Sequence, residues 1–140
     1  RLKKRVIIMM GYVKNDDVPK IMSLADVVIG VGRVALEAMA CGKPVIIAGT
    51  LVGPFGGNYG GIVTKSNVDE LSTHNFSGRN SLDKTKPDEI AEDCIRLLGD
   101  REYRLSVGRF GREYVEQEHD IRKVVKKVEA VYLDVIRRSK

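Results

Sequence analysis

The chain has 140 residues, 43% of them hydrophobic and 31% charged, a composition typical of one ordinary globular domain. No apolar run approaches the roughly 18–20 residues of a membrane span, and the amino terminus carries no signal-peptide pattern. Cys41 and Cys94 are too few for a disulfide framework. We therefore expect a cytoplasmic protein with reduced thiols in its core.

The net charge of +5 favours an anionic partner such as nucleic acid, an anionic lipid or a phosphorylated ligand. The basic residues gather in 1–5 and 122–140, without the regular interleaving of aromatic residues that single-strand binding needs and without any tryptophan. Single-stranded nucleic acid is bound through such aromatic residues, so we predict no nucleic-acid partner.

The first 24 residues predict a strand and then a helix. Residues 6–10 form a continuous apolar run, which is typical of a strand buried on both faces. Asn15 or Asp16 then caps a helix that has Pro19 in its first turn.

Residues 25–47 predict a βαβ unit around which the rest of the chain is arranged. An apolar strand at 27–29 is followed by a glycine turn at 30–32, a helix over 33–39, a stop at 41–44 and a buried strand over 45–48. Parallel strands need such a helical crossover. The predicted fold class is therefore α/β with a parallel sheet, and open sheets of this kind bind ligands at the carboxyl ends of their strands.

The second half predicts a loop, a short strand and three helices. Residues 49–61 contain six glycines in thirteen positions, which indicates a loop and not the interior of a strand. A short strand at 62–64 and an irregular connection over 65–86 follow, within which 74–79 is typical of a packed loop. Apolar spacing predicts helices over 87–98, about 102–117 and about 120–138.

The last of these helices is amphipathic. Val124, Val128, Val131 and Val135 form one apolar stripe, and lysines and arginines occupy the other face. Such a basic face is most often solvated, and a weak contact with an anionic membrane surface is the alternative.

The turn Gly30-Val31-Gly32 predicts an anion site, because it ends a strand and begins a helix. Free backbone N–H groups and the positive end of the helix dipole face outward there, and Arg33 adds a guanidinium group. The alternative is that a tight turn between strand and helix simply requires glycine.

Glu37 lies one helical turn beyond Arg33, among small and apolar neighbours. A carboxylate in a largely buried helix is costly unless a polar group meets it, and a ribose diol is one such partner because its two hydroxyls can both donate to the carboxylate. The alternative is an ordinary ion pair with Arg33.

Two neighbouring strand ends complete this candidate site. Gly11, Tyr12 and Val13 leave the preceding strand on the same carboxyl edge, where a nucleobase can lie against them. Gly56 and Gly57 belong to the glycine-rich loop, whose backbone can close over a diphosphate or a sugar. A purely flexible connection is the alternative for that loop.

Other chemistries find less support in the sequence. His74 and His119 have no serine or cysteine at catalytic spacing, and no metal-ligand spacing is present, so we expect no metal and no other cofactor. Gly30-x-Gly32-x-x-Ala35 fits a dinucleotide fingerprint. However, its helix is about one turn too short and the following strand ends without an acidic residue, which points away from NAD.

Residues 30–46, GVGRVALEAMACGKPVI, closely resemble the donor-site signature of a large family of retaining glycosyltransferases with the GT-B fold, the glycosyl transferases group 1. Residues 23–28, SLADVV, and 60–63, GGIV, are similar to the family pattern too. The family includes many sugar transferases of the bacterial cell envelope.

The resemblance implies a Rossmann-like domain that binds a nucleoside-diphosphate sugar. Glu37 matches the second carboxylate of the family's E-x7-E motif, which is expected to hold the ribose hydroxyls, and Gly32 and Arg33 match the turn beside the diphosphate and sugar. The position of the first carboxylate is occupied by Ile29. How the donor sugar is held, and whether transfer is retaining or inverting, therefore stay open.

The resemblance also implies a longer protein, because a complete family member has an amino-terminal acceptor domain and two further βα units. We expect residues 1–118 to form the incomplete carboxyl-terminal half of a GT-B fold, with 119–140 as the basic helix of the same domain. The predicted function is donor binding in a glycosyltransferase that acts in the cytoplasm or at the inner face of the membrane. The acceptor domain would complete it in cis or as a second chain, and the isolated chain would be inactive. The alternatives are a nucleotide-binding or regulatory module without catalysis and a fragment of a Rossmann NAD(P)-dependent oxidoreductase.

Overall fold

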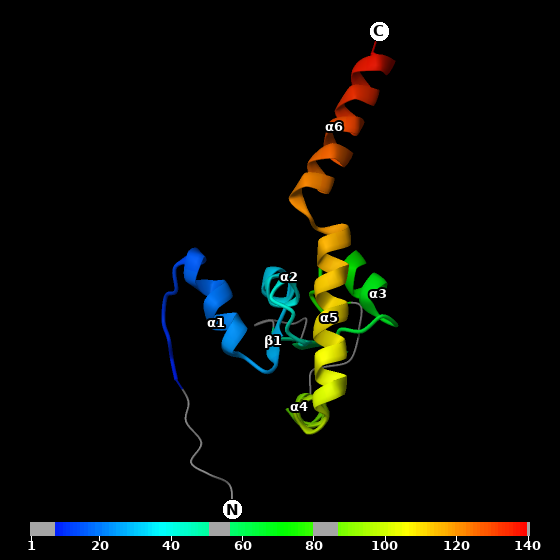
Figure 1. Ribbon diagram of the computed structural model, residues 1–140. Coiled ribbons are helices and arrows are strands. Elements are labelled where there is room, and N and C mark those ends of the chain that lie inside the picture. The colour runs from blue at the N-terminus through cyan, green and yellow to red at the C-terminus, as the bar shows by residue number, and fades with distance from the viewer. Residues whose placement is uncertain (1–7, 51–56, 80–86, 140) are drawn as a thin grey trace, which may run out of the picture.

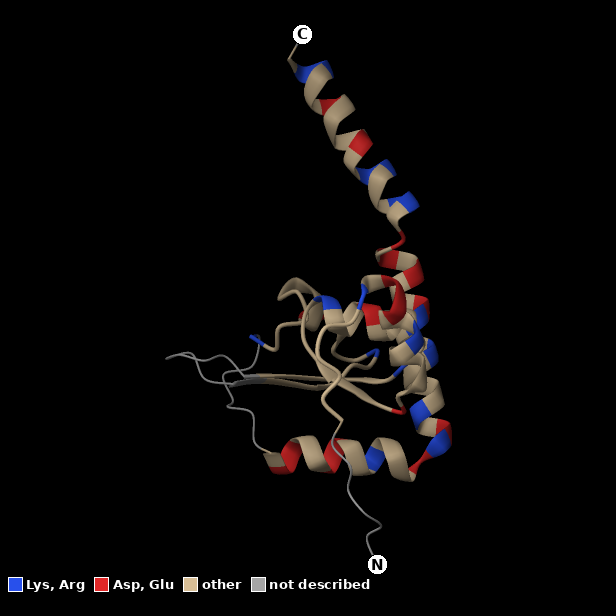
Figure 2. Ribbon diagram, turned by 90° about the vertical axis from the view of Figure 1, so that its left-hand side faces the viewer, with Lys and Arg blue, Asp and Glu red and all other residues tan. Residues whose placement is uncertain are grey.

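The computed structural model describes residues 8–50, 57–79 and 87–139, which form a three-stranded sheet with helices on both faces. Figure 2 shows the sheet edge-on, with one helix running below it and the remaining helices above and to the side. The structure is thus mixed α/β, as predicted, and is consistent with a partial Rossmann-like half of a GT-B fold.

The predicted βαβ unit is confirmed. Strand β1 (Val28–Gly30) pairs in parallel with β2 (Val45–Thr50), and helix α2 (Arg33–Ala40) makes the crossover between them. The helix ends at a turn in which Gly42 has a φ of 68°, a conformation that favours glycine. The aligned Cα pairs are Val28 with Val45, Ile29 with Ile46 and Gly30 with Ile47.

The third strand corrects the sequence prediction. Strand β3 (Gly57–Ile62) runs antiparallel to β2, so the described sheet is mixed and not purely parallel. The expected loop over 49–61 is therefore wrong for 49–50 and 57–61, which lie in strands, and 51–56 lie outside the described residues. The predicted strand at 62–64 keeps only its first residue.

Packing explains why this strand is rich in glycine. The pairing of β2 with β3 shifts register between Ile47 and Ala48, and opposite that shift Gly61 has a φ of 69°, a backbone conformation that favours glycine. A Cβ on the neighbouring Gly60 would lie 2.7 Å from Leu71 Cδ2 and 3.0 Å from Ile47 Cβ. The glycines thus make room for neighbouring side chains within the sheet.

The sheet separates two cores. Alternate side chains of β2 point to opposite faces, so that Val45 and Ile47 enter one core and Ile46 enters the other. The α2-side core consists of Ala35, Ala38, Met39, Val45, Ile47, Val63, Val68, Leu71 and Phe76. The α4-side core, named after helix α4 (Pro87–Gly99), consists of Ile46, Ile62, Leu97 and Val107.

The amino-terminal segment follows the prediction only in part. Residues 8–14 form no strand, and Met9 is 90% exposed, so the predicted buried strand at 6–10 is wrong for the residues that are described. An apolar run becomes a strand only where it finds a partner strand and a core, and 8–10 find neither. The helix that follows is confirmed as the 3₁₀ turn η1 (Asn15–Asp17) and α1 (Val18–Leu24), with Pro19 in the first turn.

The expected irregular connection contains a helix. Residues 65–86 were predicted to lack regular structure, whereas α3 (Val68–Thr73) lies within them and buries Leu71. The interpretation of 74–79 as a packed loop is confirmed, because Phe76 is 1% exposed and packs edge-on to Tyr114 with 6.2 Å between ring centroids. A six-residue helix is too short to show a clear apolar period in the sequence.

The three predicted carboxyl-terminal helices are present. They are α4 (Pro87–Gly99), α5 (Arg101–Glu118) and α6 (Ile121–Arg138). Helix α4 covers β2 and β3, and Tyr59 of β3 donates a hydrogen bond to Asp93 of α4. Burial raises the pKa of Tyr59 well above its usual value, and the hydrogen bond to Asp93 makes the second-largest contribution in the same direction.

Helix α5 connects the two cores. It contributes Val107 to the α4-side core, and its Phe110, Tyr114 and Val115 pack against the α2-side core. It also lies against α2, where a Cβ on Gly111 would be 3.0 Å from Met39 Cγ. These close approaches place α2 on the sheet.

Helix α6 projects away from the rest of the molecule (Figure 1) and contains no buried residue. Its first turn is capped by Asp120, which accepts a hydrogen bond from the Arg122 backbone N–H at 2.9 Å. Side-chain and backbone hydrogen bonds from Arg122 lower the pKa of Asp120 to about 2. None of the helices in the described part of the chain is long and apolar enough to cross a membrane.

We predict that Gly108→Ala destabilises the protein by about 1–3 kcal/mol, the usual cost of overpacking. A Cβ on Gly108 would overlap the carbonyl oxygen of Gly42 and lie 3.1 Å from its carbonyl carbon, so α5 would have to move away from α2. Urea unfolding followed by circular dichroism measures the change.

Gly99→Ala is the matched control, because a Cβ at the end of α4 meets nothing within 4 Å. This variant should be as stable as the wild type or slightly more stable. Equal stabilities of the two variants would contradict the proposed close contact between α5 and the Gly42 turn.

Candidate functional site

The glycine turn between β1 and α2 is held by internal contacts. Gly32 has a φ of 58°, and its N–H donates to the carbonyl oxygen of Phe76 at 2.9 Å. A Cβ on Gly30 would lie 2.6 Å from Val34 Cγ1. The expectation of an outward-facing N–H is therefore wrong for Gly32, and both glycines have structural reasons to be glycine.

Arg33 and Glu37 form the ion pair that the sequence left as an alternative. Arg33 Nη2 lies 3.2 Å from Glu37 Oε1, and the side chains are 87% and 42% exposed. Glu37 is thus half-exposed, and the expectation that burial forces it to seek a ligand is wrong. Within the described chain the other oxygen, Oε2, makes no hydrogen bond.

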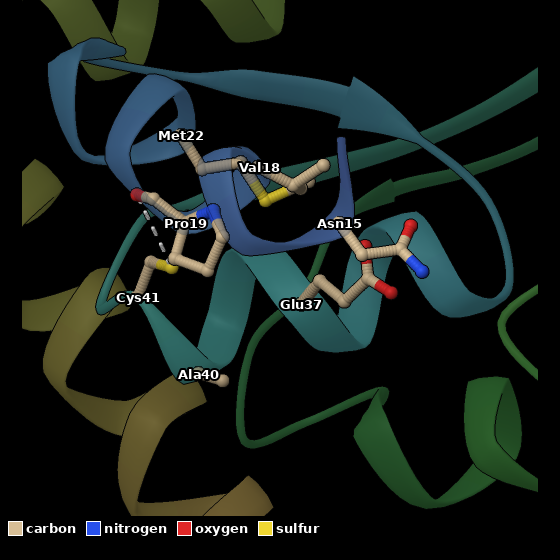
Figure 3. A pocket seen from close by; sticks show the side chains of 7 residues that line it. All are labelled: Asn15, Val18, Pro19, Met22, Glu37, Ala40 and Cys41. Atoms are coloured by element: carbon tan, nitrogen blue, oxygen red, sulfur yellow. Dashed lines mark hydrogen bonds between the residues drawn. The ribbon is translucent and has the colours of Figure 1, made fainter. Parts of the chain in front are cut away.

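Glu37 borders a cavity of about 360 Å³ between α1 and α2, which we call the α1–α2 cavity (Figure 3). Small-molecule pockets span roughly 300–1,000 Å³, so this cavity is at the lower end of that range. Its lining residues are Asn15, Val18, Pro19, Met22, Glu37, Ala40 and Cys41.

The predicted base-binding residues lie elsewhere. Gly11, Tyr12 and Val13 do not line the α1–α2 cavity, and Tyr12 is 90% exposed. Because the described residues before them form no strand, the expected strand end beside β1 is not formed there. Their contact with a nucleobase stays a prediction, but the strand end at the edge of the sheet that suggested it is absent from the described residues.

Gly56 lies outside the described residues, whereas Gly57 begins β3 and pairs with Thr50 at the carboxyl end of β2. Gly30 ends β1 and pairs with Ile47 of the same strand. Gly57 therefore lies beyond Gly30 in the direction of the carboxyl end of β2, in a strand and not in the expected loop. Its contact with a diphosphate or a sugar stays a prediction.

Two cavity residues were assigned other roles by the sequence. Asn15 was expected as a helix cap, but its side chain makes no capping hydrogen bond. Cys41 was expected as a core thiol, but it is only partly buried and its Sγ lies 3.9 Å from the carbonyl oxygen of Pro19. The sequence feature that could have indicated this cavity is helical spacing. Positions 15, 18, 19 and 22 share one helix face, and positions 37, 40 and 41 share another.

The histidines have structural surroundings. The His119 ring lies 5.8 Å from the Tyr114 ring and 6.5 Å from the Phe76 ring, between centroids. His74 Nδ1 lies 3.0 Å from the Thr73 hydroxyl oxygen. In the described ranges no group of three or more histidine, cysteine, aspartate or glutamate side chains is arranged to hold a metal ion.

Comparison with known proteins adds to this geometry. The family described as "Glycosyl transferases group 1" matches residues 1–55, which include β1, α2, Glu37 and the α1–α2 cavity. The N-acetyl-alpha-D-glucosaminyl L-malate synthase of Bacillus anthracis is 30% identical over 133 residues, which cover 91% of this chain and 31% of that protein.

Two further relatives are named as glycosyltransferases. The GDP-mannose-dependent alpha-(1-6)-phosphatidylinositol monomannoside mannosyltransferase of Mycobacterium tuberculosis is 34% identical over 118 residues, which cover 75% of this chain and 26% of that protein. An uncharacterized glycosyltransferase of Methanocaldococcus jannaschii is 28% identical over 132 residues, which cover 90% of this chain and 30% of that protein.

The chain spans less than a third of the length of these relatives. No solved structure matches it significantly. The family match lies on the βαβ unit, and the similarity to the relatives extends over most of the chain. On this evidence the chain belongs to the glycosyl transferases group 1 family.

Proposed function

We propose that this chain is the donor-binding portion of a glycosyltransferase, which transfers a sugar from a nucleoside-diphosphate sugar to an acceptor. The acceptor would be held by a domain outside these 140 residues, in the same chain or in a second one. The observation that carries the proposal is the position of Glu37. Its half-exposed carboxylate borders the α1–α2 cavity, about one helical turn beyond the glycine turn between β1 and α2. The chain's membership of the glycosyl transferases group 1 family, and the glycosyltransferases among its relatives, support this role.

The charges near the start of α2 suit a diphosphate. Arg33 is 87% exposed, and the N–H groups of the first turn add a partial positive charge. An exposed ion pair contributes only about 0–1 kcal/mol, so Arg33 can turn from Glu37 to a phosphate at little cost. Glu37 can then accept hydrogen bonds from the ribose hydroxyls.

The role of this chain in catalysis would be to position the donor and to stabilise the departing diphosphate. It would supply no nucleophile and, on this proposal, need no metal. Ile29 replaces the first carboxylate of the family motif and is 47% exposed, so the donor sugar meets an apolar side chain there. That replacement favours a second candidate, a nucleotide-binding module without transfer activity.

Calorimetry with UDP, GDP and ADP tests donor binding by the 140-residue chain. We expect at least one of them to bind, and Glu37→Ala to weaken that binding by about 1.5–3 kcal/mol, as for a hydrogen bond to a charged group. The folded stability should change little, because the carboxylate is exposed and its ion pair is weak.

Glu116→Ala provides the matched control. Glu116 pairs with Arg112 at 2.8 Å with the same four-residue spacing on α5, and its side chain is 61% exposed. This variant should bind the nucleotide as the wild type does. An unchanged affinity in Glu37→Ala would remove Glu37 from the site, and absence of binding by all three nucleotides would contradict donor binding.

We also propose that α6 lies on an anionic membrane surface. Its apolar stripe is exposed, with Val128 at 47%, Val131 at 63% and Val135 at 55%. Six lysines and arginines against two acidic residues give the rest of the helix a positive charge. Exposed apolar and basic faces on one helix are typical of interfacial helices, and each basic residue near an anionic surface adds about 1 kcal/mol.

Sedimentation with lipid vesicles measures this contact. We expect binding to vesicles of phosphatidylcholine and phosphatidylglycerol, little binding to phosphatidylcholine alone, and loss of binding in Val128→Asp. Ile95→Asp is the control, because Ile95 of α4 is also apolar and 70% exposed but lies outside α6. Equal binding of the two variants, or none by the wild type, would contradict the proposal.

A further inference from the structure

Two neighbouring residues in the loop after α3 have a backbone conformation that is uncommon for any residue other than glycine. Asn75 has a φ of 53° and Phe76 a φ of 50°. Asparagine tolerates this left-handed region, whereas a bulky residue such as phenylalanine is rare there. Such a conformation costs free energy and persists only where the surroundings hold it, which is most often at functional sites. The contacts of this loop therefore indicate why the conformation is kept.

The loop is held in this conformation by its own helix and by the core. The N–H of Asn75 donates to the carbonyl oxygen of Ser72 at 2.9 Å, and that of Phe76 donates to Leu71 at 2.7 Å. The Phe76 ring is 1% exposed and packs edge-on to Tyr114. Burial of so large a ring offsets the cost of the left-handed backbone.

The carbonyl oxygens of the loop lie against the glycine turn between β1 and α2. The carbonyl oxygen of Phe76 accepts the hydrogen bond from the Gly32 N–H at 2.9 Å. A Cβ on Gly32 would lie 3.8 Å from the carbonyl oxygen of Asn75. A Cβ on Gly49 of β2 would lie 4.0 Å from that of Ser77. The loop thus supports the turn after β1 and also reaches the carboxyl end of β2.

The first N–H groups of α2 divide into two that are occupied and two that are available. A helix begins with four N–H groups that have no partner further up the helix. Here the Gly32 N–H is bound by Phe76, and the Ala35 N–H donates to the Gly32 carbonyl oxygen at 3.1 Å. The backbone N–H groups of Arg33 and Val34 make no hydrogen bond within the described chain. Their direction depends on where Gly32 is held.

We propose that Asn75 and Phe76 are positioning residues for donor binding. Their left-handed turn holds Gly32 so that the N–H groups of Arg33 and Val34 are already directed at the diphosphate before the donor arrives. This inference rests on the proposed function and adds to it a support that acts through Gly32, without contact with the donor. A turn fixed in advance binds more tightly than one that must be ordered by its ligand.

Calorimetry of Asn75 variants with UDP, GDP and ADP tests this role. Asn75 is exposed and its side chain makes no hydrogen bond within the described chain, so a substitution there changes mainly the backbone preference. Valine is strongly disfavoured in the left-handed region, and Asn75→Val should weaken nucleotide binding about five- to tenfold. Asn75→Gly adopts the region freely and should bind as the wild type does. Circular dichroism establishes that each variant is folded at the temperature used.

Thr73→Val is the matched control. Thr73 is also exposed and lies two residues away, but it is the last residue of α3 and has an ordinary helical backbone. This variant introduces the same side chain without opposing a positive φ, and it should bind nucleotide as the wild type does. Equal weakening by Thr73→Val and Asn75→Val would contradict the role of the left-handed turn.

Hydrogen exchange measured by NMR in the absence of nucleotide follows the turn itself. The Gly32 amide should be protected in the wild type, and Asn75→Val should speed its exchange about tenfold relative to that of Ala38 in the interior of α2. A general loss of stability would speed both amides alike. That result would show a structural role only and would overturn the proposal.

The outcomes separate this inference from the proposal beneath it. If nucleotide binding depends on Glu37 but is unchanged in Asn75→Val, or falls equally in Asn75→Gly, donor binding stands and the positioning role is wrong. If UDP, GDP and ADP all fail to bind to the wild type, the proposed function itself is wrong and the inference falls with it.

Discussion

The close contact between the backbone of α5 at Gly108 and the turn that follows α2 determines where the candidate site lies. Helix α5 approaches the turn after α2 so closely that a single methyl group at Gly108 would overlap the Gly42 carbonyl oxygen. Gly111, one turn further on, lies against Met39 of α2 in the same way. The position of α2, and with it that of Arg33, Glu37 and the wall of the α1–α2 cavity, depends on these approaches.

Elements with a local signal could be predicted from the sequence. The βαβ unit was found because a strand, a helix and a strand follow one another with glycines at both helix ends, and each of these signals lies within a few residues. The same holds for α4, α5 and α6, whose apolar spacing continues over three turns or more. Hydrophobic spacing does not depend on what the helix packs against.

Elements that depend on distant partners could not be predicted in this way. Gly60 and Gly61 look like loop residues in the sequence. In the structure, Gly60 leaves room for the side chains of Ile47 and Leu71, and Gly61 has a positive φ beside the register shift between β2 and β3. The apolar run at 6–10 looks like a strand, yet its described part pairs with no strand. Glu37 was singled out by its residue type and position, although the reason given, burial, was wrong. The sequence did not indicate that Asn15 lines the same cavity as Glu37, because this depends on the packing of α1 against α2.

Helix α5 reaches both sides of the sheet, with Val107 in the α4-side core and Phe110 and Tyr114 against the α2-side core. If one core unfolds, α5 loses the packing of one of its faces, and the other core depends on the same helix. We therefore expect the two hydrophobic clusters to unfold together, as one cooperative unit and not as two independent layers.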